Sequence, residues 1–166
     1  EYVDESQGIG YNTISLDIPW GQVERQPGVF DFERFDHLVA YAANRGYHLQ
    51  IKPWWVRCSY PMWICPDLEQ ECHPAEGKTW APQLTFADPE LTGRIARYSG
   101  EIARRYRGHP NIVYTPVCGP SAEMEYSHGQ YCDYGRAANA RFAGWLEKKY
   151  QDIATLNQAW GSKHAD

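Results

Sequence analysis

The 166 residues of this chain can enclose one good core, so a single domain is expected. Hydrophobic residues make up 43% and charged residues 22%, which is typical of a soluble globular protein. The net charge of −5, with no stripe of Lys and Arg interleaved with aromatics, argues against a nucleic-acid partner. No apolar run approaches the ~20 residues that cross a bilayer, and the first residues lack the pattern of a signal peptide, so no membrane partner is expected and the compartment stays open.

The first β-rich run is residues 12–18, and Pro19 is expected to end it. After a turn, Asp31 is the expected N-cap of a helix, and Gly46 stands where its C-terminal cap should lie. The apolar residues of this helix recur at helical spacing and predict one buried face: Phe35, Leu38, Val39 and Ala42.

A second strand is expected at residues 47–52, followed by an irregular segment, residues 53–87, rich in Pro, Trp and Cys. Asp88 and Pro89 then begin a helix as cap and first helical residue. Its predicted buried face consists of Leu91, Ile95, Tyr98 and Ile102. Its arginines are expected to form a solvated face, with Glu101 four residues before Arg105 as a pairing partner.

A third strand is expected at residues 111–117, and two helices close the chain. The first of these helices has an apolar face predicted to be buried: Ala138, Phe142, Trp145 and Leu146. The second is a short helix over residues 152–160. Alternation of strands and helices predicts an α/β fold with a parallel sheet covered by helices.

The chain contains three β/α units, whereas a complete TIM (β/α)₈ barrel has eight and takes roughly 250 residues. We therefore expect residues 1–166 to form a single partial barrel domain, a fragment of a larger catalytic domain. The remainder of the barrel or a second copy of the chain would then be its protein partner.

Five cysteines are an odd number and none lies in a C-x-x-C pair, so free thiols are expected rather than disulfides or a zinc site. They are Cys58, Cys65, Cys72, Cys118 and Cys132. The 7 tryptophans and 12 tyrosines have two interpretations, because aromatic rings stack on sugars and also fill cores. From composition alone, core packing is the stronger of the two.

In parallel β/α folds, functional residues gather at the C-terminal ends of strands. The three strand ends of this chain bring polar and aromatic residues: Asp17, Trp20 and Glu24; Lys52, Trp54, Trp55 and Arg57; and residues 119–126. Carboxylates together with aromatic rings at one edge are what glycoside hydrolysis requires. An oligosaccharide or glycoside is therefore the expected ligand. The expected substrate-binding residues are Asp17, Trp20, Trp54, Trp55 and Tyr126.

Glu123 is the expected catalytic residue, a general acid. Gly119 and Pro120 break the third strand, so the residues that follow can turn over the barrel mouth. Burial beside aromatic side chains would keep a carboxyl group protonated near neutral pH. Glu125 is the alternative candidate for the acid. If neither residue has a catalytic role, Glu123 and Glu125 are both carboxylates on the surface of a loop.

Several segments resemble glycoside hydrolase family 42, the barrel β-galactosidases, in order and spacing. They are residues 16–32, 60–64, 104–110, 142–150 and 156–161, of which the last two form the most specific motif. The resemblance covers nearly the whole chain and implies strands two to four of the barrel. It implies a glycosidase acting on a terminal β-galactoside, with Glu123 as proton donor and a nucleophile on a later strand.

Two positions depart from the pattern of that family. Ala122 stands where the family has an Asn that contacts the 2-hydroxyl of the sugar, and only Cys132 remains of a cysteine zinc cluster. No metal and no cofactor are therefore expected. Ala122 keeps open an alternative function, a barrel that binds carbohydrate without cleaving it.

A second resemblance is to family 14, the β-amylases. It rests on residues 16–24, where it implies that Asp17 binds the substrate, and on residues 119–126, where it again marks Glu123 as the general acid. Both resemblances imply the same fold and the same acid. They differ in the sugar, so α-glucan hydrolysis is a further alternative.

Overall fold

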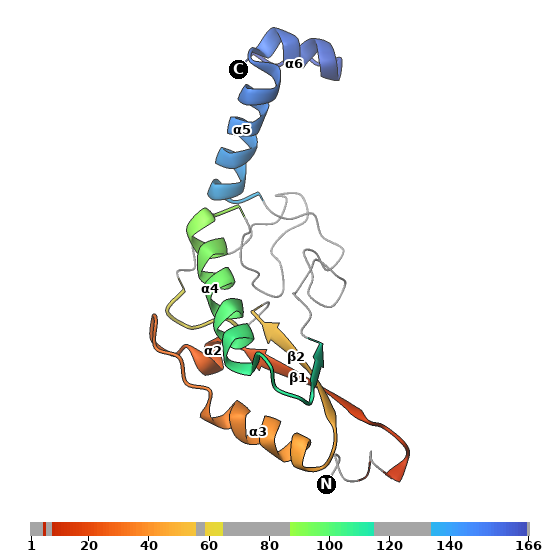
Figure 1. Ribbon diagram of the computed structural model, residues 1–166. Coiled ribbons are helices and arrows are strands. Elements are labelled where there is room, and N and C mark those ends of the chain that lie inside the picture. Colours follow the sequence, from red (N-terminus) through yellow and green to blue (C-terminus); the bar gives the residue numbers. More distant parts are fainter. Residues whose placement is uncertain (1–4, 6–7, 56–58, 65–86, 115–133, 166) are drawn as a thin grey trace.

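The computed structural model describes residues 5, 8–55, 59–64, 87–114 and 134–165. Figure 1 shows the order of its elements along the chain. They are β1 (Thr13–Pro19), α2 (Trp20–Val23), α3 (Glu33–Asn44), β2 (His48–Trp54), α4 (Pro89–Tyr106), β3 (Ile112–Tyr114), α5 (Arg136–Tyr150) and α6 (Ile153–Trp160).

The three strands form one parallel sheet in the order β1-β2-β3. This confirms the parallel α/β architecture predicted from the alternating pattern. β1 ends at Pro19, and α2, which the sequence did not indicate, begins at the next residue. β2 runs two residues beyond its expected end and includes Pro53 and Trp54.

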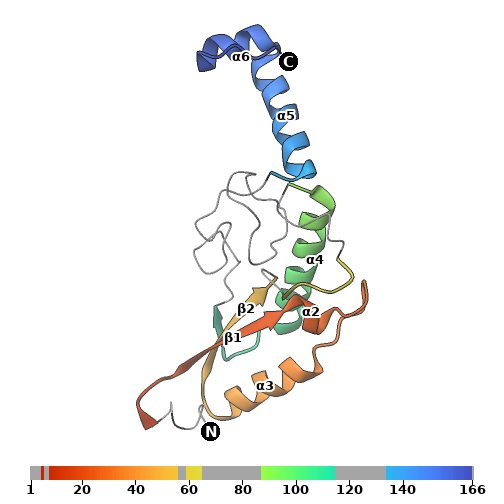
Figure 2. The same ribbon diagram turned by 180° about the vertical axis from the view of Figure 1, so that it is seen from behind.

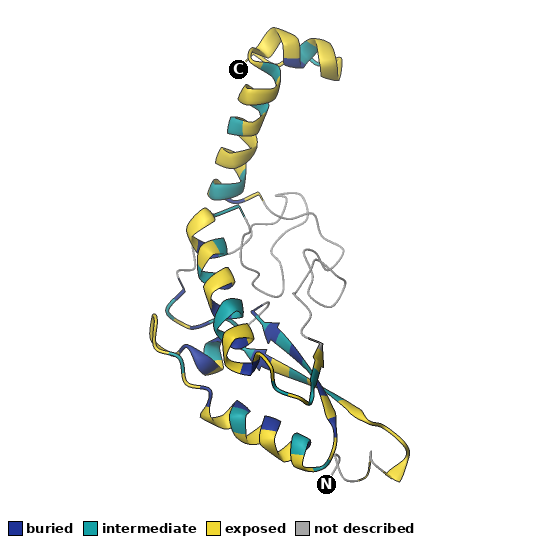
Figure 3. Ribbon diagram, in the orientation of Figure 1, coloured by how far each residue is buried: buried dark blue, intermediate teal, exposed yellow. Residues whose placement is uncertain are grey.

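The sheet has one apolar and one polar face. Ile18, Leu49 and Ile51 are buried, and they alternate along their strands with more exposed polar residues such as Asp17 and Lys52. Successive side chains of a strand point to opposite faces, so the buried set lies on one face. Figure 3 shows the alternation of burial along β1 and β2.

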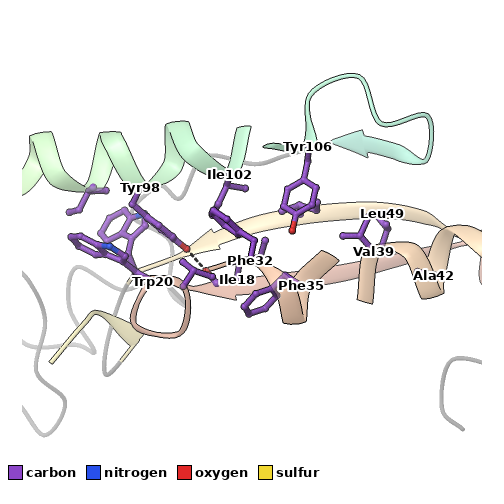
Figure 4. Close-up of a cluster of buried hydrophobic side chains, with 14 of the residues drawn as sticks. Ile18, Trp20, Phe32, Phe35, Val39, Ala42, Leu49, Tyr98, Ile102 and Tyr106 are labelled. Carbon is purple, nitrogen blue, oxygen red and sulfur yellow. Dashed lines mark hydrogen bonds between the residues drawn. The ribbon is translucent and has the colours of Figure 1, made fainter. Parts of the chain in front are cut away.

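Helices α3 and α4 cover the apolar face (Figures 1 and 2). Figure 4 shows how their inward side chains meet the strands. Those of α3 are Phe35, Val39 and Ala42, and those of α4 are Leu91, Ile95, Tyr98, Ile102 and Tyr106. The predicted buried faces of both helices are thus confirmed except at Leu38, which is 41% exposed because it lies on the outer side of α3.

The helix ends follow their local sequence closely. The carboxylate of Asp88 accepts a hydrogen bond of 2.8 Å from the Leu91 amide, so the predicted cap of α4 is confirmed. The cap expected at Asp31 is wrong by one residue: Phe32 is the N-cap of α3, although Asp31 does accept from the Glu33 amide. Gly46 follows the C-cap with a φ of 77°, a conformation that glycine adopts without strain.

The burial predicted for the apolar face of α5 is not found in this chain. No residue of α5 is buried, and Phe142 and Trp145 are 51% and 48% exposed. Figures 1 and 2 show the reason: α5 and α6 extend away from the sheet instead of packing against it. Periodicity identifies the apolar face of a helix, but it does not show whether residues 1–166 include the element that packs against that face.

Within the described residues, none of the helices combines the length and apolar character that a membrane span requires.

Candidate functional site

The polar face of the sheet places an ion pair near the C-terminal ends of β1 and β2. Asp17 and Lys52 are register partners on the two strands, and Lys52 Nζ lies 2.9 Å from Asp17 Oδ1. The Asp17 side chain is 45% exposed and the Lys52 side chain is 27% exposed. Because this face turns away from α3 and α4, it is the face that lines the interior of a closed barrel.

Trp54 is the next residue of β2 on the same face. It is the last residue of the strand, and the Lys52 ammonium group lies 5.4 Å from the centre of its ring. The indole is partly exposed. Asp17, Lys52 and Trp54 therefore present a carboxylate, an ammonium group and a flat ring side by side, and we call these three residues the strand-end cluster.

Trp20 does not join this cluster. Its side chain is 0% exposed, stacked on the Tyr98 ring at 5.4 Å and set edge-on to the Trp63 ring at 5.9 Å. The ring therefore packs α4 and the loop around Trp63 against α2. Trp55 is 7% exposed and also belongs to the hydrophobic core. In this structure, neither tryptophan presents a ring face to a ligand.

Glu24 is a fully buried carboxylate with three donors around it. It accepts hydrogen bonds from Trp20 Nε1 at 2.5 Å, from the Gly28 amide at 2.6 Å and from Arg97 Nη2 at 2.7 Å. The Glu24 carbonyl also accepts from Trp63 Nε1 at 2.9 Å. The sequence placed Glu24 among the strand-end residues, whereas the structure gives it a role in holding α2, α4 and the turn at Gly28 together.

The Tyr98 hydroxyl joins the C-terminal ends of β1 and β2 from the apolar side of the sheet. It donates to the carbonyl of Ile18 in β1 and accepts from the amide of Trp54 in β2 at 3.0 Å (Figure 4 draws the first bond). Pro53, the register partner of Ile18, has no amide hydrogen to contribute to the ladder. The sequence indicated Tyr98 only as a core residue. The prolines near both strand ends were a signal that backbone groups there need a side-chain partner, which the Tyr98 hydroxyl provides.

The remaining candidates lie outside the described residues. These are Glu123, its alternative Glu125, Tyr126 and Arg57, together with all five cysteines. Within the described part of the chain, no group of three or more His, Cys, Asp or Glu side chains could hold a metal ion. Of the residues expected to bind a sugar, the structure thus brings Asp17 and Trp54 together, and it places Lys52 beside both.

Parallel β/α units with helices on one face and a polar face opposite define a portion of a TIM (β/α)₈ barrel. The family model of glycoside hydrolase family 42, described as beta-galactosidase, matches residues 3–164, and the chain belongs to this family. It is 30% identical to the beta-galactosidase bgaB of Geobacillus kaustophilus over 94% of its own length. It spans only 23% of that relative.

Solved structures establish the same fold. The beta-galactosidase from the psychrophilic Marinomonas ef1 matches with a TM-score of 0.77 at 22% identity, over 96% of this chain and 24% of that one. The catalytic domain of the beta-amylase from Paenibacillus polymyxa matches with a TM-score of 0.69 at 17% identity, over 99% of this chain and 46% of that one. The partial barrel expected from the sequence is thereby confirmed.

Proposed function

We propose that the full-length protein is a glycoside hydrolase that releases a terminal sugar from β-galactosides. The observation that carries this proposal is the family match over residues 3–164, since the family and the relatives found are described as beta-galactosidases. The strand-end cluster supports it, because a carboxylate, an ammonium group and an indole ring suit the hydroxyl groups and apolar face of a pyranose.

Glu123 is the proposed proton donor. It follows β3 in the chain, and the segments that follow parallel strands begin at the same edge of the sheet. As a carboxylic acid, Glu123 would protonate the glycosidic oxygen while the bond to the anomeric carbon breaks. In a retaining reaction, it would next take a proton from the water that attacks the glycosyl-enzyme. The nucleophilic carboxylate would come from a later strand.

The test compares Glu123→Gln with Glu125→Gln in the full-length protein. A basic leaving group needs its proton more than an acidic one does, so Glu123→Gln should lower kcat/KM for lactose by about 10²–10⁴-fold. The loss should be much smaller for 2,4-dinitrophenyl β-galactoside. We use kcat/KM because it reports the steps up to the first irreversible one, before the base is needed.

Glu125→Gln is the matched control and should retain the leaving-group dependence of the wild type. Equal turnover of both substrates by Glu123→Gln and wild type would remove Glu123 from the reaction. If Glu125→Gln alone shows the selective loss, Glu125 is the acid.

Ala122 favours one second candidate, a barrel that binds carbohydrate without hydrolysing it. The family carries an Asn at this position, and a contact to the 2-hydroxyl strengthens in the transition state, so its loss affects catalysis more than binding. Binding of galactosides by the full-length protein, without any release of reducing sugar, would support this second candidate over the first.

A further inference from the structure

We propose that Lys52 is a substrate-binding residue, which donates a hydrogen bond to a sugar hydroxyl that Asp17 accepts from in turn. This inference rests on the proposed function in that it takes a sugar as the ligand. It adds a cationic donor beside the expected Asp17.

Strand register fixes where Lys52 points. On the polar face, the paired rows along β1 and β2 are Ser15 with Gln50, then Asp17 with Lys52, then Pro19 with Trp54 at the end of both strands. The Asp17–Lys52 row therefore lies one step below the mouth, with the Trp54 ring above it. A ligand that enters at the C-terminal ends of the strands meets Trp54 first and this row next.

Stability does not account for this ion pair. A partly exposed pair of this kind contributes little to stability, because solvent screens it and ordering two side chains costs entropy. Enclosed in a barrel without a ligand, the same charges would lose their hydration at a cost that the pair recovers only in part. Barrel interiors are commonly filled by branched apolar residues instead. A polar row beneath the mouth is therefore better explained by a polar ligand.

The chemistry of the pair matches a hydroxyl group. Within the described part of the chain, the ammonium group of Lys52 makes one ion pair, to Asp17 Oδ1, and one cation–π contact, to Trp54. An ammonium group has three N–H donors and a carboxylate has two acceptor oxygens, so both partners retain hydrogen-bonding capacity. A sugar hydroxyl donates and accepts at once, and it can bridge Asp17 Oδ2 and Lys52 Nζ while the Trp54 ring lies beside the pyranose.

The experiment measures binding, which does not depend on turnover. Calorimetry on the full-length protein would compare methyl β-thiogalactoside with its 2-, 3-, 4- and 6-deoxy analogues, in wild type, Lys52→Met, Lys52→Arg and Gln50→Leu. Wild type should lose about 10–100-fold in affinity for the analogue that lacks the bridging hydroxyl. Lys52→Met should bind the parent sugar more weakly by a similar factor and no longer discriminate against that analogue.

Two further variants serve as controls for this result. Lys52→Arg keeps the charge and the donors, so it should retain part of the discrimination. Gln50→Leu changes the next row down on the same face and should leave the deoxy profile unchanged. The inference is overturned if Lys52→Met keeps the wild-type profile, whatever its overall affinity. It is also overturned if neither Lys52→Met nor Lys52→Gln folds, as judged by near-ultraviolet circular dichroism, because Lys52 is then structural.

The outcomes separate this inference from the proposed function. If wild type binds none of the galactosides, the proposed substrate class fails. If wild type binds them and Lys52→Met discriminates as wild type does, only the role of Lys52 fails. A loss of turnover in Glu123→Gln with the deoxy profile intact leaves the role of Lys52 standing.

Discussion

Arg97 reaches from α4 to Glu24 and forms an ion pair of 2.7 Å with a carboxylate that is 0% exposed. The two residues lie 73 positions apart along the chain. The Arg97 side chain is 47% exposed, whereas the Glu24 side chain has no contact with bulk solvent. A carboxylate removed from bulk solvent is stable only when hydrogen-bond donors surround it, so Glu24 depends on its protein donors.

Glu24→Ala should therefore destabilise the protein strongly. The change leaves the Trp20 indole N–H and the Gly28 amide without their acceptor, and we expect a loss of about 2–5 kcal/mol in unfolding free energy. Glu24→Gln keeps one acceptor oxygen and should lose less. Thermal unfolding of the full-length variants measures the effect. Glu33→Ala, at an exposed position of α3, is the control, and a similar loss in both alanine variants would contradict the role of Glu24.

Tyr98→Phe tests the bridge between the strand ends. Removing the hydroxyl leaves the Ile18 carbonyl and the Trp54 amide without that partner, so we expect a loss of about 1–3 kcal/mol. Hydrogen exchange at the Trp54 amide should accelerate more than exchange at the centre of β2. Tyr11→Phe, at a position 64% exposed, should change neither quantity. Unaltered exchange at Trp54 in Tyr98→Phe would mean that the hydroxyl does not hold the strand end.

Gly21 and Gly93 form a matched pair of helical glycines with opposite expectations. A Cβ at Gly21 would lie 2.9 Å from the Tyr60 carbonyl oxygen, whereas a Cβ at Gly93 meets nothing within 4 Å. Gly21→Ala should therefore destabilise by about 1–3 kcal/mol through overpacking against backbone. Gly93→Ala should stabilise α4 by about 0.5–1 kcal/mol, because alanine loses less backbone entropy. A melting temperature of Gly21→Ala at or above that of wild type would contradict the close contact at Gly21.

Asp36 should make stability depend on acid pH. Hydrogen bonds from Arg105, and from the Tyr106 hydroxyl, hold the pKa of the Asp36 carboxyl below its usual value. The folded state therefore binds this proton less readily than the unfolded state. The stabilisation is present above a pH of about 4, where an unfolded Asp titrates, and is lost as the pH falls through the lower folded pKa.

Asp36→Asn should show this dependence directly. The melting temperature of wild type should exceed that of the variant near neutral pH, and the difference should shrink below pH 4. Asp31→Asn, at an exposed position whose side chain accepts a hydrogen bond from the Glu33 amide, serves as the comparison. A difference between wild type and Asp36→Asn that stays constant with pH would show that the pair with Arg105 does not titrate in this range.

Local patterns in the sequence were enough to predict the strands, the longer helices and most of the buried faces of α3 and α4. Three of these features depend on residues within a few positions of one another. They are the cap of α4 at Asp88, the end of β1 at Pro19 and the buried faces of α3 and α4. Alternation of strands and helices was likewise enough for a parallel sheet, because such connections require one. Position at the strand ends brought Asp17 and Trp54 into the site hypothesis.

The sequence did not distinguish the side chains that lie exposed at the strand ends from those that pack in the core. Trp20 and Asp17 both looked like strand-end ligands, yet Trp20 is enclosed by Tyr98 and Trp63 because α4 and a distant loop pack on it. Arg105 looked like a partner for Glu101, but it reaches Asp36 on α3, and Arg104 pairs with Glu101 instead. Tyr98, Trp63 and Asp36 come from distant parts of the chain, so no local spacing can reveal these contacts.

Side-chain periodicity and helix capping are local properties, so they were enough to predict parallel β/α units with polar residues at the strand ends. The folded arrangement was needed to show that Lys52 faces Asp17, that Glu24 is a buried anchor and that no residue of α5 is buried. The physical reason is that register and helix packing set these relationships between residues far apart in the chain.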